Sequence, residues 1–140
     1  MSYDLERFVV AQEGVLDRAL AEIVAGHKRT HWMWFVFPQL AGLGSSPTAR
    51  TYAISGAAEA RAYLDHPVLG PRLRECATAL LAHEGVSAER ILGFSDDLKL
   101  CSSMTLFAAV ADDPAIFEAV LDKFCGTRDR RTLDLLDRPI

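Results

Sequence analysis

The stretch His31-Trp32-Met33-Trp34-Phe35-Val36-Phe37-Pro38-Gln39 holds both tryptophans of the chain and places six large apolar side chains directly before a proline. A short, continuous apolar run is either a buried strand or a buried helix, and periodicity alone does not separate the two. We expect a buried helix that ends before Pro38, because the chain contains no second run of this kind to pair with it as a strand. This segment is then predicted to be the central rod around which the other helices assemble.

Helical geometry separates the two tryptophans. Side chains two positions apart on a helix point about 200° apart, so Trp32 and Trp34 do not face the same core surface equally. We therefore expect one of them to border a cleft or a second layer. Gln39 follows in an otherwise apolar neighbourhood, and if its amide is buried it needs hydrogen-bond partners.

Capping residues, prolines and glycines divide the rest of the chain into helices. Asp4 and Gly26 bracket a first helix whose apolar residues, from Leu5 to Ile23, recur at roughly 3.6-residue spacing. Serine or aspartate caps, two of them followed by proline, predict further helices at 47–54, 57–64, 67–81, 87–93, 95–109, 113–126 and 129–136. The sequence predicts one all-α domain over residues 1–140, a compact bundle of about seven to eight helices with irregular, orthogonal packing.

The composition is that of an ordinary globular protein. Of 140 residues, 50% are hydrophobic and 24% charged, and the net charge is −4. This mild acidity argues against a nucleic-acid partner. The N-terminus shows no secretory signal, and the longest apolar run is far shorter than the roughly 20 residues needed to cross a bilayer. We expect a cytoplasmic protein without a membrane partner.

The three cysteines, Cys76, Cys101 and Cys125, are odd in number and share no CxxC spacing. We expect them to be reduced, with neither a disulfide nor a thiolate zinc site. Cys101 lies in a predicted helix near Lys99, but an apolar helix face favours a buried, inert thiol over a nucleophile.

Two polar groups could carry chemistry. His27 and His31 are spaced as in the H-E-x-x-H zinc motif, but Lys28 stands where the general-base glutamate would be, so we expect no metal site. Ser102, Ser103 and Thr105 follow Lys99 in one predicted helix. They either donate hydrogen bonds to an anion or a sugar-like group, or bond the carbonyl one turn back. No phosphate loop, dinucleotide fingerprint or other cofactor motif is present, so no cofactor is expected.

Four segments together resemble the bacterial domain-of-unknown-function family 1810. They are Asp4–Phe8, His31–Gln39, His66–Leu73 and Asp97–Phe107. The resemblance covers nearly the whole chain and implies a single all-helical domain, without an established activity, cofactor or catalytic residue. Some members are labelled calpastatin-like, yet inhibitors of that type are long, polar and disordered. The sequence therefore does not support protease inhibition.

We expect a small protein that binds a polar, nucleotide- or sugar-like metabolite, in a cleft between His31–Gln39 and Lys99–Thr105. The sequence does not decide whether this protein is an enzyme. His31 is the candidate proton donor or acceptor and Trp34 the stacking wall. The polar anchors would be Gln39, Arg50, Lys99, Ser103 and Thr105.

Two alternatives stay open. The aromatic residues could instead dock a protein or pair two copies of the chain, which would make the molecule an interaction module. Alternatively, both segments are core, and function lies elsewhere on the surface. The sequence leaves the oligomeric state undetermined.

Overall fold

Side chains at the helix starts explain where several elements begin. The structure is a computed structural model that describes residues 3–137. As the sequence predicts, Ser46, Ser87 and Asp129 accept hydrogen bonds from backbone N–H groups three residues later, which have no partner within the helix. These bonds cap α4 (Pro47–Thr51), α7 (Ala88–Leu92) and α10 (Arg130–Leu136).

The all-α class is confirmed for the described residues, although the number of helices differs from the expected seven to eight. Between residues 3 and 137 the chain forms ten α-helices and one π-helical segment. One reason is that the predicted first helix is two helices, because Gly14 adopts φ +70° between them, a conformation that other residues disfavour. The remaining elements are α1 (Glu6–Gln12), α2 (Leu16–Ala25), α3 (Met33–Val36), α5 (Ala57–Asp65), α6 (Leu69–Leu81), α8 (Asp96–Val110), α9 (Ala115–Val120) and the π-helical η1 (Leu121–Cys125).

Several predicted caps are wrong. Asp4 does not cap α1, whose N-cap is Leu5 and has no side-chain hydrogen bond. Ser95 makes no side-chain hydrogen bond to the first turn of α8, and α5 is preceded by Gly56 rather than capped by Ser55. Glu59, inside α5, instead accepts a hydrogen bond from the Ser55 N–H at 2.8 Å. Arg7 contacts the same carboxylate at 3.0 Å, so this glutamate ties α5 to α1.

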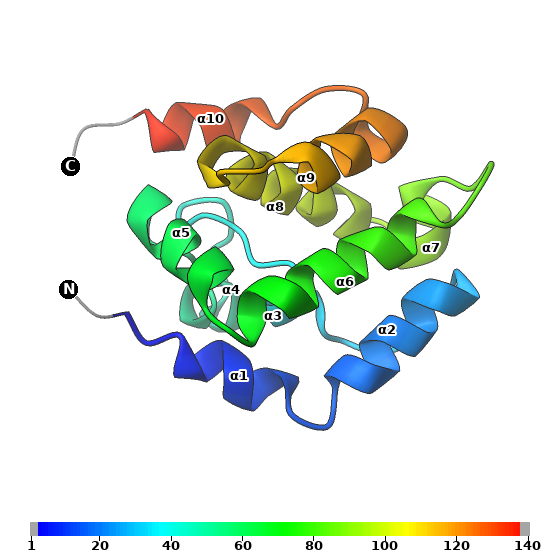
Figure 1. Ribbon diagram of the computed structural model, residues 1–140, viewed down its shortest axis with the longest axis horizontal. Coiled ribbons are helices and arrows are strands. Elements are labelled where there is room, and N and C mark those ends of the chain that lie inside the picture. The colour runs from blue at the N-terminus through cyan, green and yellow to red at the C-terminus, as the bar shows by residue number, and fades with distance from the viewer. Residues whose placement is uncertain (1–2, 138–140) are drawn as a thin grey trace.

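Helix α8 occupies the position that the sequence assigned to the tryptophan segment. It packs against α5, α7, α9, α10 and η1. In Figure 1 it lies behind α9 and below α10, while α1 and α2 follow the opposite edge of the molecule. The expectation of a central tryptophan rod is wrong, because α3 is a helix of 4 residues, whereas the 15 residues of α8 reach five neighbouring elements.

The tryptophan segment nevertheless has the predicted local structure. Helix α3 ends before Pro38, as expected for a buried apolar run followed by proline. Trp32 is 1% exposed, whereas Trp34 is only half-buried. The prediction that one tryptophan faces the core and the other its margin is therefore confirmed.

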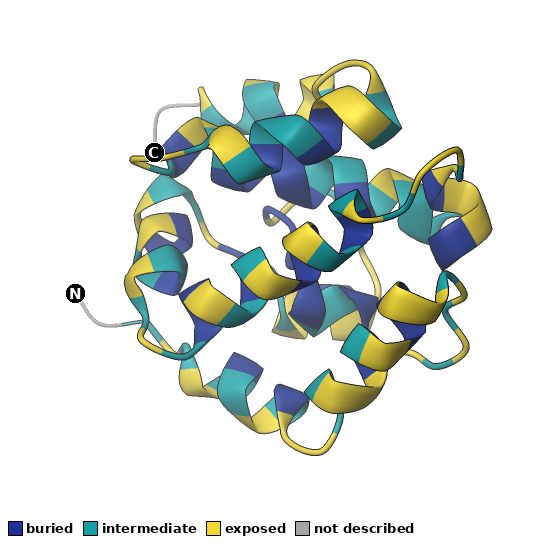
Figure 2. Ribbon diagram, turned by 45° about the vertical axis from the view of Figure 1, so that its right-hand side comes forward, coloured by how far each residue is buried: buried dark blue, intermediate teal, exposed yellow. Residues whose placement is uncertain are grey.

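Burial follows the inward faces of the helices, as Figure 2 shows by colour. The buried apolar residues form one cluster that contains side chains from Phe8 near the start of the chain to Leu121 near its end. Aromatic rings connect α5, α8 and α9 through this cluster, with ring centroids 5.4 Å apart for Tyr63 and Phe107 and 5.9 Å apart for Phe107 and Phe117. None of the helices between residues 3 and 137 is long and apolar enough to span a membrane.

A buried carboxylate holds the loop between α2 and α3. Glu22 accepts hydrogen bonds from the backbone N–H groups of Arg29 and Thr30, from the Thr30 hydroxyl, and from the indole N–H of Trp32 at 2.9 Å. Burial acts to raise the pKa of Glu22, but these donors outweigh it and lower the pKa to about 2. The loop that precedes the tryptophans is thus fixed by one charged acceptor.

The chain after Pro38 is held in place by one parallel bridge and one close packing contact. The Ile54 N–H donates to the Gln39 carbonyl at 2.9 Å, and the Ile54 carbonyl accepts from Ala41 at 2.8 Å. Beyond the bridge, a side chain at Gly44 would lie 2.7 Å from the β-carbon of Ala49 and 3.4 Å from the ring of Trp34. Glycine therefore allows this loop to pack on Trp34 and leaves Gln39 beside α8.

Candidate functional site

A surface cavity of about 660 Å³ lies between the end of the tryptophan segment, the first half of α8 and the chain that joins η1 to α10. Its lining includes Gln39 from the first of these segments and Lys99 and Ser102 from the second. The two segments predicted to form a cleft are therefore adjacent. The third wall, residues 125–131, is one that the sequence analysis did not assign to any site.

Lys99 is held at this cavity by an aromatic ring and a carboxylate. Its ammonium lies 4.6 Å from the centroid of the Trp34 ring and 2.9 Å from Asp96. The second oxygen of Asp96 contacts Lys28 at 2.9 Å, and Lys28 in turn lies over Trp32, 5.1 Å from the ring centroid. Burial acts to raise the pKa of Asp96, but the two lysines together hold it below its usual value. Each tryptophan ring therefore contacts one lysine ammonium, and both ammonium groups form an ion pair with Asp96.

Three arginines contribute to the third wall. Arg128 forms an ion pair with Glu118 at 2.8 Å, and Arg130 forms one with Asp134 at 3.4 Å. The side chains of the first pair are partly exposed and those of the second are largely exposed. Arg131 donates to the Gly42 carbonyl at 3.5 Å, and it has no carboxylate partner within residues 3–137. Exposed ion pairs of this kind contribute little and exchange readily, so these guanidinium groups remain able to bind an anion.

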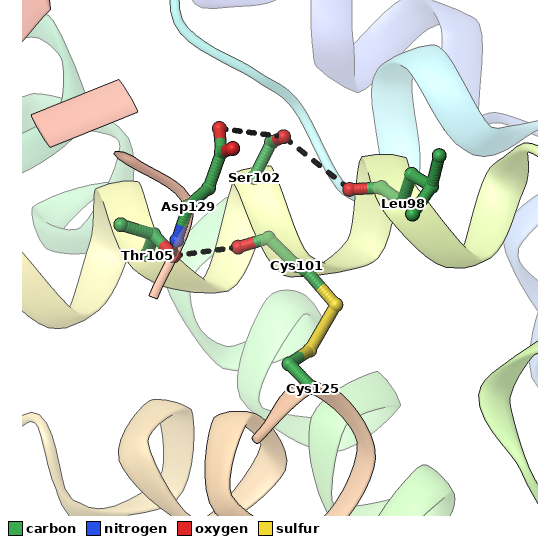
Figure 3. The surroundings of a disulfide bond; sticks show 6 residues. All are labelled: Leu98, Cys101, Ser102, Thr105, Cys125 and Asp129. Atoms are coloured by element: carbon green, nitrogen blue, oxygen red, sulfur yellow. Dashed lines mark hydrogen bonds between the residues drawn. A yellow bond between two sulfur atoms is a disulfide. The ribbon is translucent and has the colours of Figure 1, made fainter. Parts of the chain in front are cut away.

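Asp129 is the acidic residue in the cavity lining, and hydrogen bonds within the protein occupy it. Its carboxylate accepts from Ser102 at 3.0 Å and from the hydroxyl and the N–H of Thr132. Its own N–H donates to Thr105 at 2.9 Å, and Thr105 also donates to the Cys101 carbonyl at 2.7 Å (Figure 3). The carboxylate therefore anchors the start of α10 to α8. It is one negative charge in a cavity lining that contains four cationic side chains.

The expectation of three reduced cysteines is wrong. Cys101 of α8 and Cys125 of η1 form a disulfide across 24 positions of sequence (Figure 3), and both residues line the cavity. Their pairing depends on how α9 and η1 fold back against α8, which neither the spacing nor the odd number of cysteines reveals. Cys76 is the free cysteine of the described chain, and burial raises its pKa to about 12.

The other residues predicted for the site do not line the cavity. Some are buried or bonded within the protein, and the others are exposed elsewhere on the surface. Ser103 is fully buried and its hydroxyl has no partner among the described residues, while Thr105 makes the structural bonds given above. Trp34 contacts Lys99 rather than contributing to the lining. Arg50 and His31 are exposed and lie outside this cavity.

His27 and His31 do not share the helix that the zinc-motif spacing would require. No helix joins the two histidines, because α2 ends at Ala25 and α3 begins at Met33. Within residues 3–137 no group of three or more histidine, cysteine or acidic side chains is arranged to hold a metal ion.

Sequence reasoning missed the arginine wall. None of Arg128, Arg130 and Arg131 was among the predicted ligand anchors, because such arginines have the pattern of solvated surface. A signal was present, because the run Arg128-Asp129-Arg130-Arg131 contains the capping aspartate of a helix. Basic residues at a capped helix start are held in place by backbone geometry rather than left on a free loop.

Comparison with known proteins agrees with the fold and adds no activity. The profile of the family described as "Protein of unknown function (DUF1810)" matches residues 2–136. Among curated proteins, none matches the chain. The chain is similar to a solved structure titled as the conserved hypothetical protein Rv1873 from Mycobacterium tuberculosis, with 55% sequence identity and a TM-score of 0.96. The similarity covers 98% of this chain and 99% of that one.

Proposed function

The chain belongs to the DUF1810 family, whose description names no activity, and from its cavity we propose that the protein binds a small anionic metabolite. The ligand would carry a phosphate or carboxylate group on a polar, nucleotide- or sugar-like body. The proposal refines the expectation of a polar ligand by giving that ligand a charge.

The observation that carries this proposal is the imbalance of charge in the cavity. Lys99, Arg128, Arg130 and Arg131 all contribute to the lining, and Asp129 is the acidic residue among them. A concave surface with one predominant sign of charge concentrates ligands of the opposite sign. On a protein with a net charge of −4, such a concentration of positive charge is a local feature rather than a property of the whole surface.

Size and chemistry support the same class of ligand. A volume of about 660 Å³ lies within the range of small-molecule sites and is sufficient for a nucleotide or a sugar phosphate. Guanidinium groups match phosphate and carboxylate oxygens in two-point hydrogen bonds. Gln39, Ser95 and Thr127 add neutral polar groups to the lining for a hydroxylated body.

We propose binding rather than catalysis, since His31, the predicted proton carrier, does not line this cavity. The absence of nucleic-acid and membrane partners stays a prediction, as does a cytoplasmic location.

A thermal-shift panel tests the proposal. It would compare inorganic phosphate, a nucleoside monophosphate and a sugar phosphate with the matching uncharged nucleoside and sugar. A ligand at 100 times its Kd stabilises the folded protein by about 2.7 kcal/mol, so a positive result is readily measured. We expect shifts for the charged compounds and none for their neutral counterparts.

Arg131→Gln provides the matched test of the site. We expect it to weaken binding by about tenfold or more, since loss of a charge-assisted hydrogen bond costs about 1.5 kcal/mol or more. Arg18→Gln, at an exposed position of α2 outside the lining, should leave binding unchanged. Equal shifts with charged and neutral ligands, or equal losses in the two variants, would contradict an anion site here.

The alternative of an interaction module rests on one feature. Phe94, two residues before α8, and Leu98, in the first turn of α8, are 79% and 55% exposed. Exposed large apolar side chains mark a docking surface when they form one continuous patch. Analytical ultracentrifugation tests the self-pairing version: a dimer that Phe94→Ser dissociates would support it, and a monomer at all concentrations would exclude it.

A further inference from the structure

The disulfide lies at the proposed ligand site rather than within the core. Cys101 and Cys125 are both half-buried and both line the cavity that contains the four cationic side chains. Figure 3 shows the bond connecting α8 to the chain below it, on the same helix as Ser102 and its contact to Asp129. A small molecule in the cavity would therefore lie beside the two disulfide-bonded residues.

The positive charge around the cavity favours thiol–disulfide exchange at the Cys101–Cys125 bond. The attacking species and the leaving group in that reaction are both thiolates, so nearby cations stabilise both. Lys99 precedes Cys101 by two positions and Arg128 follows Cys125 by three, and all four residues line the same cavity. Cys76 offers the internal contrast, because it is 1% exposed and surrounded by apolar residues of the core.

We propose that the Cys101–Cys125 pair is a redox-active site that exchanges with a small thiol carrying a carboxylate or another anionic group. The anionic group would bind the arginine wall, and the thiolate of the same molecule would attack one sulfur of the pair. The choice of an anionic thiol rests on the proposed function, whereas the accessibility of the disulfide does not.

The exchange conserves electrons in two steps. The incoming thiolate forms a bond to one cysteine sulfur, the Cys101–Cys125 bond breaks, and the other cysteine leaves as a thiolate that takes up a proton. The thiolate of a second small molecule then attacks the small-molecule sulfur of the mixed disulfide, the bond to the protein sulfur breaks, and that cysteine leaves as a thiolate that takes up a proton. The products are the reduced cysteine pair and the oxidised dimer of the small thiol, so the protein gains the two electrons that the thiols lose.

Three small thiols of similar size test the proposal on the oxidised, full-length chain. They are mercaptopropionate, which is anionic, mercaptoethanol, which is neutral, and cysteamine, which is cationic. Opening is followed by trapping free thiols with an alkylating reagent and locating the modified cysteines by peptide mass spectrometry. Rates are compared per thiolate and then divided by the rate of the same thiol with a small neutral disulfide, because the nucleophilicity of a thiolate also rises with its pKa.

We expect mercaptopropionate to open the pair at least about tenfold faster than cysteamine at low salt, in line with electrostatic concentration in a cleft. High salt should reduce this preference. Arg131→Gln should lower the ratio and Arg18→Gln should preserve it. Alkylation should appear at Cys101 and Cys125 and not at Cys76.

Two outcomes would overturn the proposal. If the disulfide opens only in urea, it is a structural bond, and a phosphate-induced thermal shift would still leave the proposed function intact. If it opens in the folded protein at equal rates for all three thiols, the cavity does not select an anionic thiol. In that case phosphate binding, measured separately, decides whether the proposed function fails as well.

Discussion

The Glu22 cluster and the arginine-lined cavity both concentrate charge beside the tryptophan segment, yet they use it in opposite ways. Glu22 is buried and receives hydrogen bonds from two backbone N–H groups, a hydroxyl and an indole. At the cavity, Arg131 finds only a carbonyl oxygen at 3.5 Å among the described residues. The hydrogen bonds of Glu22 all lie within the protein, whereas the guanidinium group of Arg131 is available to a ligand.

The difference shows how to separate structural from functional polar groups. A charge whose partners all lie within the protein stabilises one conformation, and its removal should be measured as lost stability. A charge at a solvent-filled cavity contributes little to stability, and its removal should be measured as lost binding. The predictions below test this division, beginning with the largest expected effect.

The two tryptophans should differ most. Trp32→Ala is expected to cost about 4 kcal/mol of the free energy of unfolding, because it removes a fully buried ring and the indole donor to Glu22. Trp34→Ala should cost about 1 kcal/mol, since the ring is half-buried and lies between the Lys99 ammonium and the loop at Gly44. Urea unfolding followed by circular dichroism measures both. Equal losses would show that Trp34 belongs to the core as fully as Trp32.

Removing the disulfide should have the next largest effect. Cys125→Ser opens a loop of 24 positions, for which the chain-entropy estimate is about 3 kcal/mol. The comparison is between oxidised wild type and variant in urea, with reduced wild type as the control. We expect reduced wild type and variant to unfold at similar urea concentrations. Unchanged stability in the variant would mean that the bond does not constrain the unfolded chain.

Glu22 should give a specific acid dependence. Its pKa lies at about 2 in the folded protein against a usual 4.5, so its stabilising contribution is complete above about pH 4.5. That contribution is lost as the pH falls toward 2, because the carboxylate must then take up a proton. Glu22→Gln is expected to cost about 2 kcal/mol at neutral pH and progressively less below pH 4.5.

The measurement is the difference in unfolding free energy between wild type and Glu22→Gln across this pH range. The titration of the other carboxylates contributes equally to both proteins and cancels in this difference. Asp17→Asn, at an exposed position of the same helix, serves as the matched control and should show no such trend. A difference independent of pH would contradict the assigned role of the charge.

The smallest effects concern two hydroxyls of α8 that the sequence proposed as ligand anchors. Thr105→Val should cost about 1 kcal/mol, because the Asp129 N–H and the Cys101 carbonyl lose their partner. Ser103→Ala should be neutral or slightly stabilising, since the buried Ser103 hydroxyl has no partner to lose. Thermal unfolding of both variants measures these changes in stability. If either variant lost phosphate binding at unchanged stability, its hydroxyl would be a ligand contact after all.

Local sequence features predicted most of the helices. Ser46, Ser87 and Asp129 act as the caps that their positions indicated, and proline ends α3 as expected. The failures arose where another group provided the interaction. Ser55 does not cap α5, and its own N–H donates instead to Glu59 in the first turn of that helix.

The candidate site was predicted in part. Gln39 and Lys99 do line one cavity, because both belong to segments that combine polar groups with large apolar ones. The arginine wall was missed because a run of exposed charges has the same sequence pattern on a free surface and beside a cavity. His31 was included because it begins the tryptophan segment and Arg50 because it follows the glycine loop, and neither lies at the cavity.

The sequence by itself determined the helical class, the ends of several helices and the unequal burial of Trp32 and Trp34. These properties depend on periodicity and capping, which act over a few neighbouring residues. Only the tertiary structure decided that α8 is central, that Cys101 meets Cys125, and that the arginines face Lys99 across a cavity. Those results depend on which distant segments pack together, and the same local pattern is compatible with many such arrangements.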